Sequence, residues 1–367
     1  MNNSLIRKEC CAVNVKIELC YFKKIECLSE CHAVFHISDA KLCFLDQLKA
    51  ITSAYNELKI KMDGLYPLFK RFFVSDAANQ EEHISLLFAD SPFSVVQQPP
   101  LDGTKIALWC YFSIKEHNGY NHLWNVLRPK IESSVSAQTD ELFKRYITFL
   151  KREGCTLEDC VRTWIFVRDI DLNYQEMVKM RRKLFSFNGL TEQTHFIAST
   201  GIEGKNDLSS NMVMIDTYAV KGLNEGQQKY LYANSYLNKT HEYGVTFERG
   251  VKVEYGDRNH ILISGTASIN SNGEIVSMND VTGQTLRMLE NICALLEEGG
   301  ASLDDLVQMI IYLRDFNDYD VVKEIIENIL PSVPKVYTLA SVCRTKWLIE
   351  AECIAITDND NNNFRKL

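Results

Sequence analysis

Two parts of the chain repeat each other at a fixed spacing. Residues 135–170 match residues 281–316 without a gap, and Gly154 pairs with Gly300 at an offset of 146 residues. Eleven of these 36 pairs are identical, whereas the usual residue frequencies would give about two by chance. The repeat therefore predicts a duplicated domain.

Each copy predicts the same succession of elements. A helix at 137–153 or 283–298 leads through a glycine turn into a strand, Cys160–Val167 or Leu306–Leu313. An Arg-Asp pair and a second helix follow in both copies. We expect an α+β fold in which each copy is a mixed sheet with two helices on one face.

After the second helix the copies drift apart. We align residues 198–202 with residues 340–344, and residues 214–216 with residues 348–350. In this alignment only the second copy carries the Cys343-Arg344 pair. Copies of a duplicated fold that differ at one cleft usually have one working site. We therefore place the site in the second copy and expect the first to supply scaffold and a wall of the pocket.

The composition excludes some classes of function. The chain has 367 residues and a formal net charge of −8, which argues against a broad nucleic-acid footprint. Its 46% hydrophobic and 24% charged residues are typical of a soluble globular protein. The N-terminus lacks the apolar core of a signal peptide, and no later run has membrane-spanning length. We expect a cytoplasmic protein that contacts neither nucleic acid nor membrane.

The cysteines indicate a reducing environment. All twelve are spread through apolar segments and none forms a CxxC pair. Cys27 and Cys31 come nearest to a metal-binding spacing, but no HxxxH pair follows them. Buried, reduced thiols are favoured over zinc ligands or disulfides, so we expect neither a metal nor a cofactor.

Near the end of the second copy, the spacing of the apolar residues changes three times. The apolar residues of Tyr319–Ile329 have helical spacing, and two prolines end that helix. Two further apolar segments follow. In the last one, Glu350 and Glu352 share one face of a strand. This face is either solvated or directed into a cleft near Arg344.

These residues carry a family resemblance. The second copy resembles the YjgF/Rid superfamily in the order and spacing of Gln284-Thr285, Asn291-Ile292, Gly300, residues 303–305, residues 312–315, Pro334 and residues 349–352. Two segments are similar to the chorismatase branch, whose members hydrolyse chorismate within a Rid-like domain. They are residues 264–269, and Cys343-Arg344 followed by residues 348–350.

The resemblance implies a fold and a set of site residues. The fold would be two tandem Rid-like, or chorismate-mutase-like, domains. Residues 243–250 resemble the chorismatase segment in which an Arg on the first strand of the domain binds a substrate carboxylate. The substrate-binding set that we infer from the resemblance is Arg249, Arg344, Thr266, Ser268, Cys343 and Tyr243.

The residue types fit hydrolysis of an enol ether. Arg249 and Arg344 can each bind a carboxylate through the planar fork of the guanidinium. Cleavage needs a proton delivered to the methylene carbon, and a carboxylic acid with a raised pKa can supply it. Glu350 is the candidate acid, and the like charge of Glu352 would raise its pKa. We expect Cys343 to shape the pocket, since no His stands at a recognisable partner position.

We therefore expect a chorismatase-like hydrolase that cleaves the enolpyruvyl ether of chorismate, or of a close relative, and releases pyruvate. Two alternatives stay open. One is a non-catalytic Rid-like protein that binds a small anionic metabolite, and the other is an enamine or imine hydrolase. The enamine or imine hydrolase is disfavoured, because Val336 stands two residues after Pro334, where the resemblance implies an Arg in Rid imine hydrolases.

The expected organisation has five parts. They are a leader of uncertain structure at 1–75, a degenerate Rid-like domain at 76–222, a connector at 223–244, the Rid-like domain with the site at 245–357 and a polar tail at 358–367. Rid-like sheets often associate around a threefold axis, so the resemblance implies a homotrimer. A monomer whose two copies pair internally is the alternative.

Overall fold

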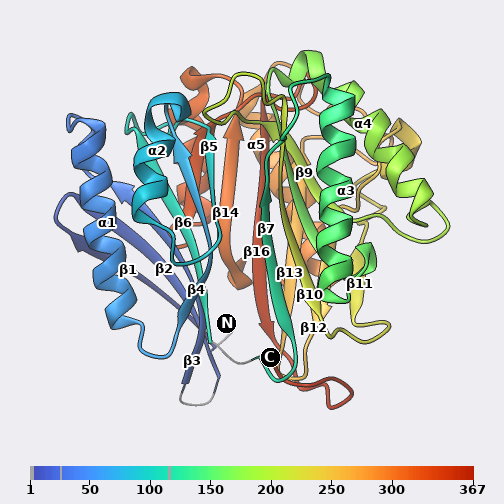
Figure 1. Ribbon diagram of the computed structural model, residues 1–367, viewed down its shortest axis with the longest axis horizontal. Helices are drawn as coiled ribbons and strands as arrows, with labels where there is room; N and C mark the ends of the chain where they lie inside the picture. The colour runs from blue at the N-terminus through green and yellow to red at the C-terminus, as the bar shows by residue number, and fades with distance from the viewer. Residues whose placement is uncertain (1–3, 25–26, 115–116) are drawn as a thin grey trace.

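The computed structural model describes residues 4–24, 27–114 and 117–367. Their strands form three sheets, and two helices accompany each sheet. The sheets meet in the middle of the molecule and the helices lie outside them (Figure 1). None of the helices in these residues is long and apolar enough to span a membrane.

Unit 1 comprises residues 5–113, and its sheet has the strand order β1-β2-β3-β6-β4-β5. A boundary at residue 75, as expected from the sequence, would cut this sheet, because β4 pairs with β5 and β6 beyond it. The described residues up to position 75 are therefore part of a folded unit and do not form a separate leader. Its elements are β1 Leu5–Ala12, β2 Val15–Lys24, β3 Cys27–Ile37, α1 Phe44–Lys61, β4 Tyr66–Val74, α2 Ala77–Leu87, β5 Phe93–Gln97 and β6 Ile106–Ser113.

Unit 2 comprises residues 121–221, and its sheet has the order β7-β10-β8-β9. A core between this sheet and its helices contains Leu142, Phe143 and Met177. The elements are β7 Asn121–Leu127, α3 Val135–Glu153, η1 Leu157–Asp159, β8 Cys160–Val167, α4 Ile170–Phe187, β9 Ala198–Glu203 and β10 Val213–Lys221.

Unit 3 comprises residues 228–358, and its sheet has the order β11-β12-β13-β16-β14-β15. Its elements are β11 Gln228–Leu231, η2 Thr240–Tyr243, β12 Gly250–Glu254, β13 Arg258–Ala267, α5 Val281–Gly299, η3 Leu303–Asp305, β14 Leu306–Leu313, η4 Phe316–Asp318, α6 Tyr319–Ile329, β15 Lys335–Leu339 and β16 Ile349–Asp358.

Units 1 and 3 have the same topology, strand for strand. In both, four antiparallel pairings are followed by one parallel pairing, β4 with β5 and β14 with β15. Unit 2 repeats the last four strands of this order. The expected α+β class with mixed sheets is confirmed, but the chain contains three units where the sequence repeat predicted two.

In every unit a buried glutamine links the first helix to the start of the last strand, and we call this link the joint. The side-chain oxygen of Gln47, Gln138 or Gln284, on the first helix, accepts a hydrogen bond from the backbone N–H at the start of the last strand. The donors are Lys105, Met212 and Leu348, at 2.8, 2.7 and 2.9 Å. These donors are therefore equivalent positions.

This equivalence corrects the sequence alignment of units 2 and 3. Because Met212 corresponds to Leu348, Met214 corresponds to Glu350, and Asp216 to Glu352. The alignment of residues 198–202 is also wrong. Thr163 and Met309 are equivalent at the offset of 146 residues, and they pair with Ser199 and Lys335 respectively. Ser199 therefore corresponds to Lys335. The reason is that α4 has 18 residues and α6 has 11, so the offset changes within the helix.

The three units close into a ring. A backbone bridge joins Ile202 to Val342 between units 2 and 3, and a second joins Pro100 to Thr338 between units 1 and 3. A third, Gln97 to Lys205, joins units 1 and 2. Each unit therefore has two neighbours within the same chain.

The polar segment after β16 is packed and does not form a loose tail. The backbone N–H of Gly256 donates to the carbonyl of Arg365 at 2.7 Å, and the Arg365 guanidinium donates to the carbonyl of Gly222 at 2.7 Å. Leu367 is buried. The segment thus connects units 2 and 3. The eleven cysteines whose side chains are described are free thiols.

Candidate functional site

A cleft between units 2 and 3 collects most of the residues that the sequence singled out. It is narrow, with a volume of about 20 Å³. Unit 3 contributes Phe247, Arg249, Gly265, Ala267, Cys343, Arg344, Trp347 and Glu350, and unit 2 contributes Tyr174, Arg181, Ser199 and Gly201.

Glu350 lies at the base of this cleft, on the second residue of β16. It pairs with Ala267 on one side and with Tyr312 on the other, so both neighbouring strands fix its position. Its side chain is 3% exposed. A Cβ atom at Gly265 would overlap Glu350 Oε1, so the carboxyl occupies the space that this glycine leaves open.

The neighbouring carboxylate, Glu352, is held by all three units. Arg162 Nη2 and Trp164 Nε1, from unit 2, donate to its oxygens at 2.9 and 2.7 Å, and Thr200 also donates to it. Arg71 Nη1, from unit 1, lies 3.7 Å from Glu352 Oε1. Glu352 is therefore fixed in the centre of the ring and forms no part of the cleft lining.

The surroundings of Glu350 favour its protonated form. Burial raises the pKa of Glu350 to about 8, and the charge of Glu352 adds to the rise, while Arg162 and Arg249 oppose it. A carboxyl with such a pKa can hold a proton near neutral pH and release it to a substrate.

Three arginines line the cleft around this acid. Arg249 Nη2 donates to the carbonyl and the side-chain oxygen of Asn238 at 2.9 and 3.1 Å. Arg344 precedes β16 in the connection from β15, as expected. The third, Arg181 on α4, donates to Thr246 Oγ1 at 3.1 Å. The site therefore carries more cationic groups than the two that the sequence indicated.

Cys343 is in the cleft but is a poor nucleophile. Burial raises the pKa of the Cys343 thiol to about 12, and the charge of Glu350 contributes to the rise. Because only the thiolate is a strong nucleophile, the side chain can shape the cavity without attacking a substrate.

Two of the predicted binding residues, Thr266 and Ser268, do not line the cleft. Thr266 Oγ1 donates to the Ser264 carbonyl at 2.9 Å, and Ser268 Oγ donates to the Val276 carbonyl at 2.8 Å. The cleft is lined by Gly265 and Ala267, which alternate with them along the chain. The expectation that these two hydroxyls face the cleft is therefore not met. The side chain of Tyr243 lies outside the described residues.

Sequence reasoning missed the individual residues of unit 2. Tyr174, Arg181 and Ser199 come from α4 and β9, and the first copy was expected only to supply a wall. Their local sequence carries no signal, because an interface side chain acquires its partner from a distant part of the chain. The sequence alignment also placed Asp216 opposite Glu350, so the absence of an acid at this position of unit 2 became visible only when the structure paired Met214 with Glu350.

Two larger cavities adjoin the cleft. A cavity of about 220 Å³ shares Arg249 with it. Another, of about 340 Å³, shares Arg344 and Trp347 with it. Asn238, which accepts the hydrogen bonds of Arg249, lines both larger cavities.

Together, the fold and the cleft define an α+β protein of repeated units, with a buried acid and arginines between two of them. Residues 247–357 match the family described as Endoribonuclease L-PSP. A RutC family protein of Pyrococcus abyssi is 39% identical over 100 residues, which make up 26% of this chain and 78% of that protein. The chain therefore belongs to the YjgF/Rid superfamily, as the sequence resemblance implied.

Two further similarities were found, one in sequence and one in fold. The 3-aminoacrylate deaminase RutC of Acinetobacter baylyi is 32% identical over 73 residues, which are 20% of this chain and 58% of the deaminase. A solved structure of a chorismatase is similar over 79% of this chain and 92% of its own, with a TM-score of 0.63 and 18% identity. The second likeness is one of fold, and it extends well beyond the segment that the family match covers.

Proposed function

We propose that this chain is a chorismatase-like hydrolase that cleaves the enolpyruvyl ether of chorismate or of a close relative and releases pyruvate. The observation that carries the proposal is Glu350, a buried carboxyl with a pKa of about 8 in a cleft lined by arginines. The likeness in fold to chorismatase supports the same assignment.

Glu350 would begin the reaction as a general acid. Its proton passes to the terminal methylene carbon of the enol ether, which becomes a methyl group, and the ether carbon becomes an oxocarbenium ion. The carboxylate left behind stabilises that cation. Water then adds to the cation and returns a proton to Glu350. The resulting hemiketal collapses to pyruvate and the ring alcohol.

The arginines would hold the two carboxylates of the substrate. Arg249 and Arg344 are the predicted pair, and Arg181 is a third candidate on the wall from unit 2. A guanidinium binds a carboxylate in a bidentate manner, which fixes the position of the group as well as its charge. This leaves the methylene carbon to be placed next to Glu350.

The substrate must open the cleft to enter it. The present volume of about 20 Å³ is too small for a ring with two carboxylates. The adjoining cavities that share Arg249 and Arg344 supply the room once those side chains turn toward a ligand. We therefore expect substrate binding to be accompanied by movement of the segment around Asn238.

A second candidate function is enamine or imine hydrolysis. It is favoured by the similarity to a 3-aminoacrylate deaminase. Val336, which stands where the family resemblance implies the arginine of that activity, lies between units 3 and 1 and does not line the Glu350 cleft. The equivalent residue of unit 2 is Thr200, which donates to Glu352. Neither position supplies a cation, so we rank this function second.

An assay with three readouts separates the candidates. The purified chain is incubated with chorismate while pyruvate is measured, and separately with 3-aminoacrylate while ammonia is measured. Pyruvate release that is lost in Glu350→Gln and kept in Glu297→Gln, an exposed glutamate of the same unit, would support the proposal. Ammonia release alone would identify a deaminase. Saturable chorismate binding without turnover would identify a binding protein.

A further inference from the structure

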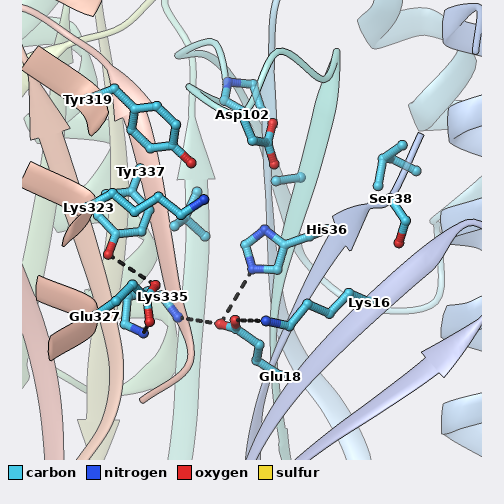
Figure 2. Close-up of a pocket in the computed structure, with 14 residues that line it drawn as sticks. Lys16, Glu18, His36, Ser38, Asp102, Tyr319, Lys323, Glu327, Lys335 and Tyr337 are labelled. Carbon is cyan, nitrogen blue, oxygen red and sulfur yellow. Dashed lines mark hydrogen bonds and ion pairs between the residues drawn. The ribbon is translucent and has the colours of Figure 1, made fainter. Parts of the chain in front are cut away.

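A second cavity lies between units 3 and 1, where the ring repeats the interface that holds Glu350 (Figure 2). Its volume is about 200 Å³. One wall comes from β2, β3, β6 and the segment before β6, and the other from β15 and α6. The ionisable residues that line it are Lys16, Glu18, His36, Asp102, Tyr319, Lys323, Glu327, Lys335 and Tyr337.

The two cavities occupy equivalent positions but differ in chemistry. His36 pairs with Ala107 as Ala267 pairs with Glu350. The new cavity therefore has an alanine in place of the acid. It holds no carboxyl at the position from which Glu350 would protonate a substrate.

Most charged groups of this cavity neutralise one another. Lys16 Nζ lies 3.1 Å from Glu18, and Lys335 Nζ lies 3.0 Å from Glu327. His36 Nε2 lies 3.5 Å from Glu18. Burial by itself would raise the pKa of Glu18, but His36 and Lys335 more than offset it and lower that pKa to about 2. In this part of the cavity the positive charges of the two lysines therefore cancel the negative charges of the two glutamates.

Two other charged groups face the cavity, one from each unit. Lys323 Nζ, on α6, lies 5.3 Å from the ring centre of Tyr319. The Asp102 carboxylate accepts hydrogen bonds from the N–H and the hydroxyl of Thr104 at 3.0 and 2.6 Å. Within the described parts of the chain neither group is in an ion pair. Figure 2 shows both side chains directed toward the space between the two walls.

We propose that this cavity binds a small zwitterion of the amino-acid type, with its carboxylate at Lys323 and its ammonium group at Asp102. A simple carboxylate would be repelled by Asp102, and a simple amine by Lys323, so only a ligand with both charges satisfies both. The rings of Tyr319 and Tyr337 offer an apolar surface to a side chain.

Isothermal titration calorimetry of the full chain tests the proposal. The probes are L-alanine, L-serine and L-phenylalanine, with acetate and ethylamine as probes that carry one charge each. We expect saturable binding of at least one amino acid, about tenfold tighter or more than either single-charge probe. No saturable binding of any of the three amino acids up to about 10 mM would overturn the proposal.

Matched variants locate the binding. Lys323→Ala and Asp102→Asn should each weaken amino-acid binding about tenfold or more, because each removes one charged partner. Both side chains are exposed, so the fold should tolerate the changes. Lys179→Ala, which removes an exposed lysine from α4, should bind as the unmodified chain does. Binding that survives in the first two variants but is lost in Arg344→Ala would place the amino acid in the Glu350 cleft and overturn the proposal.

Discussion

Two carboxyl side chains on one face of β16 have opposite environments. Glu352 accepts hydrogen bonds from Arg162, Trp164 and Thr200, which fix it in place. Glu350 lies over Gly265 in a buried cleft, and the charge of Glu352 adds to the effect of burial on its pKa. The two carboxylates repel each other, and Glu352 is the one whose charge is stabilised by hydrogen-bond donors. A proton shared between them is therefore favoured on Glu350.

The proton on Glu350 leads to a prediction for turnover. Glu350→Gln keeps the size of the side chain but removes the acid, so kcat for chorismate cleavage should fall by about 10² to 10⁴. Substrate affinity should change little, because the arginines remain. In the unmodified chain, kcat/KM should decline as pH rises through about 8, because only the protonated form donates. A pH profile of kcat/KM measures this decline, and full turnover in Glu350→Gln would show that the carboxyl is structural.

At the scale of elements, the joint between first helix and last strand recurs in all three units. The glutamine side chain accepts a hydrogen bond from the strand and donates to carbonyls of the preceding loops. In unit 3 the joint comes two residues before Glu350, since Gln284 binds the N–H of Leu348. The same local interaction therefore stabilises the fold in every unit and positions the acid in only one.

Paired variants can separate these two roles. Gln284→Ala and Gln47→Ala should each lower the free energy of unfolding by about 1–3 kcal/mol, because each leaves buried backbone groups without partners. Only Gln284→Ala should also lower kcat, since only that joint leads into β16. Chemical denaturation and the pyruvate assay measure the two effects. An equal loss of kcat in both variants would mean that it reflects general instability.

For the whole molecule, the ring of three units changes the expectation for assembly. The sequence led us to expect a homotrimer, because Rid-like sheets associate around a threefold axis. Here three such sheets already meet within one chain, and backbone bridges join every pair of units. The interfaces that a trimer of single units would form are thus occupied internally.

We therefore expect a monomer in solution. Light scattering coupled to size-exclusion chromatography should give the mass of one chain, 42.1 kDa. A stable species of three times that mass would support the homotrimer instead, and would require a contact surface outside the ring.

Units 1 and 3 are also joined by a buried charge cluster. Glu30 Oε1 lies 2.6 Å from Arg258 Nη1 and 3.0 Å from His260 Nε2. Burial by itself would raise the pKa of Glu30, but His260 and Arg258 more than offset it and hold that pKa well below its usual range. The stabilising effect is therefore present above the unfolded-state pKa of about 4 and is lost as pH falls below it.

Removing this carboxylate should weaken the whole molecule. Glu30→Gln removes the carboxylate partner of His260 and one of the two carboxylate partners of Arg258, which keeps its ion pair with the buried Asp257 at 2.6 Å. The free energy of unfolding at pH 7 should therefore fall by about 1–3 kcal/mol. The variant should also lose less stability than the unmodified chain on acidification. Asp140→Asn, which breaks the Lys144 pair on the surface of α3, should cost about 0.5 kcal/mol or less. Urea titrations at several pH values measure both.

The sequence by itself determined the features that local pattern records. The repeat with Gly154 and Gly300 predicted the mixed sheets and their helices, because hydrophobic period and turn residues respond to burial within a unit. The alternation in β16 likewise placed Glu350 and Glu352 on one face, as found. In each of the segments 72–76, 165–169 and 311–315, three apolar residues at the end of a strand are followed by a polar residue and an Asp. A match of this length is too short to reveal a third unit.

Only the tertiary structure decided how the units meet. Unit 1 keeps the strand order of unit 3 without a visible sequence repeat, since many apolar residues can fill the same sheet positions. Arg181 and Tyr174 enter the Glu350 cleft from another unit, and Arg162 and Arg71 reach Glu352 in the same way. Contacts between distant segments depend on the packing of whole units, which leaves no period or motif in the local sequence.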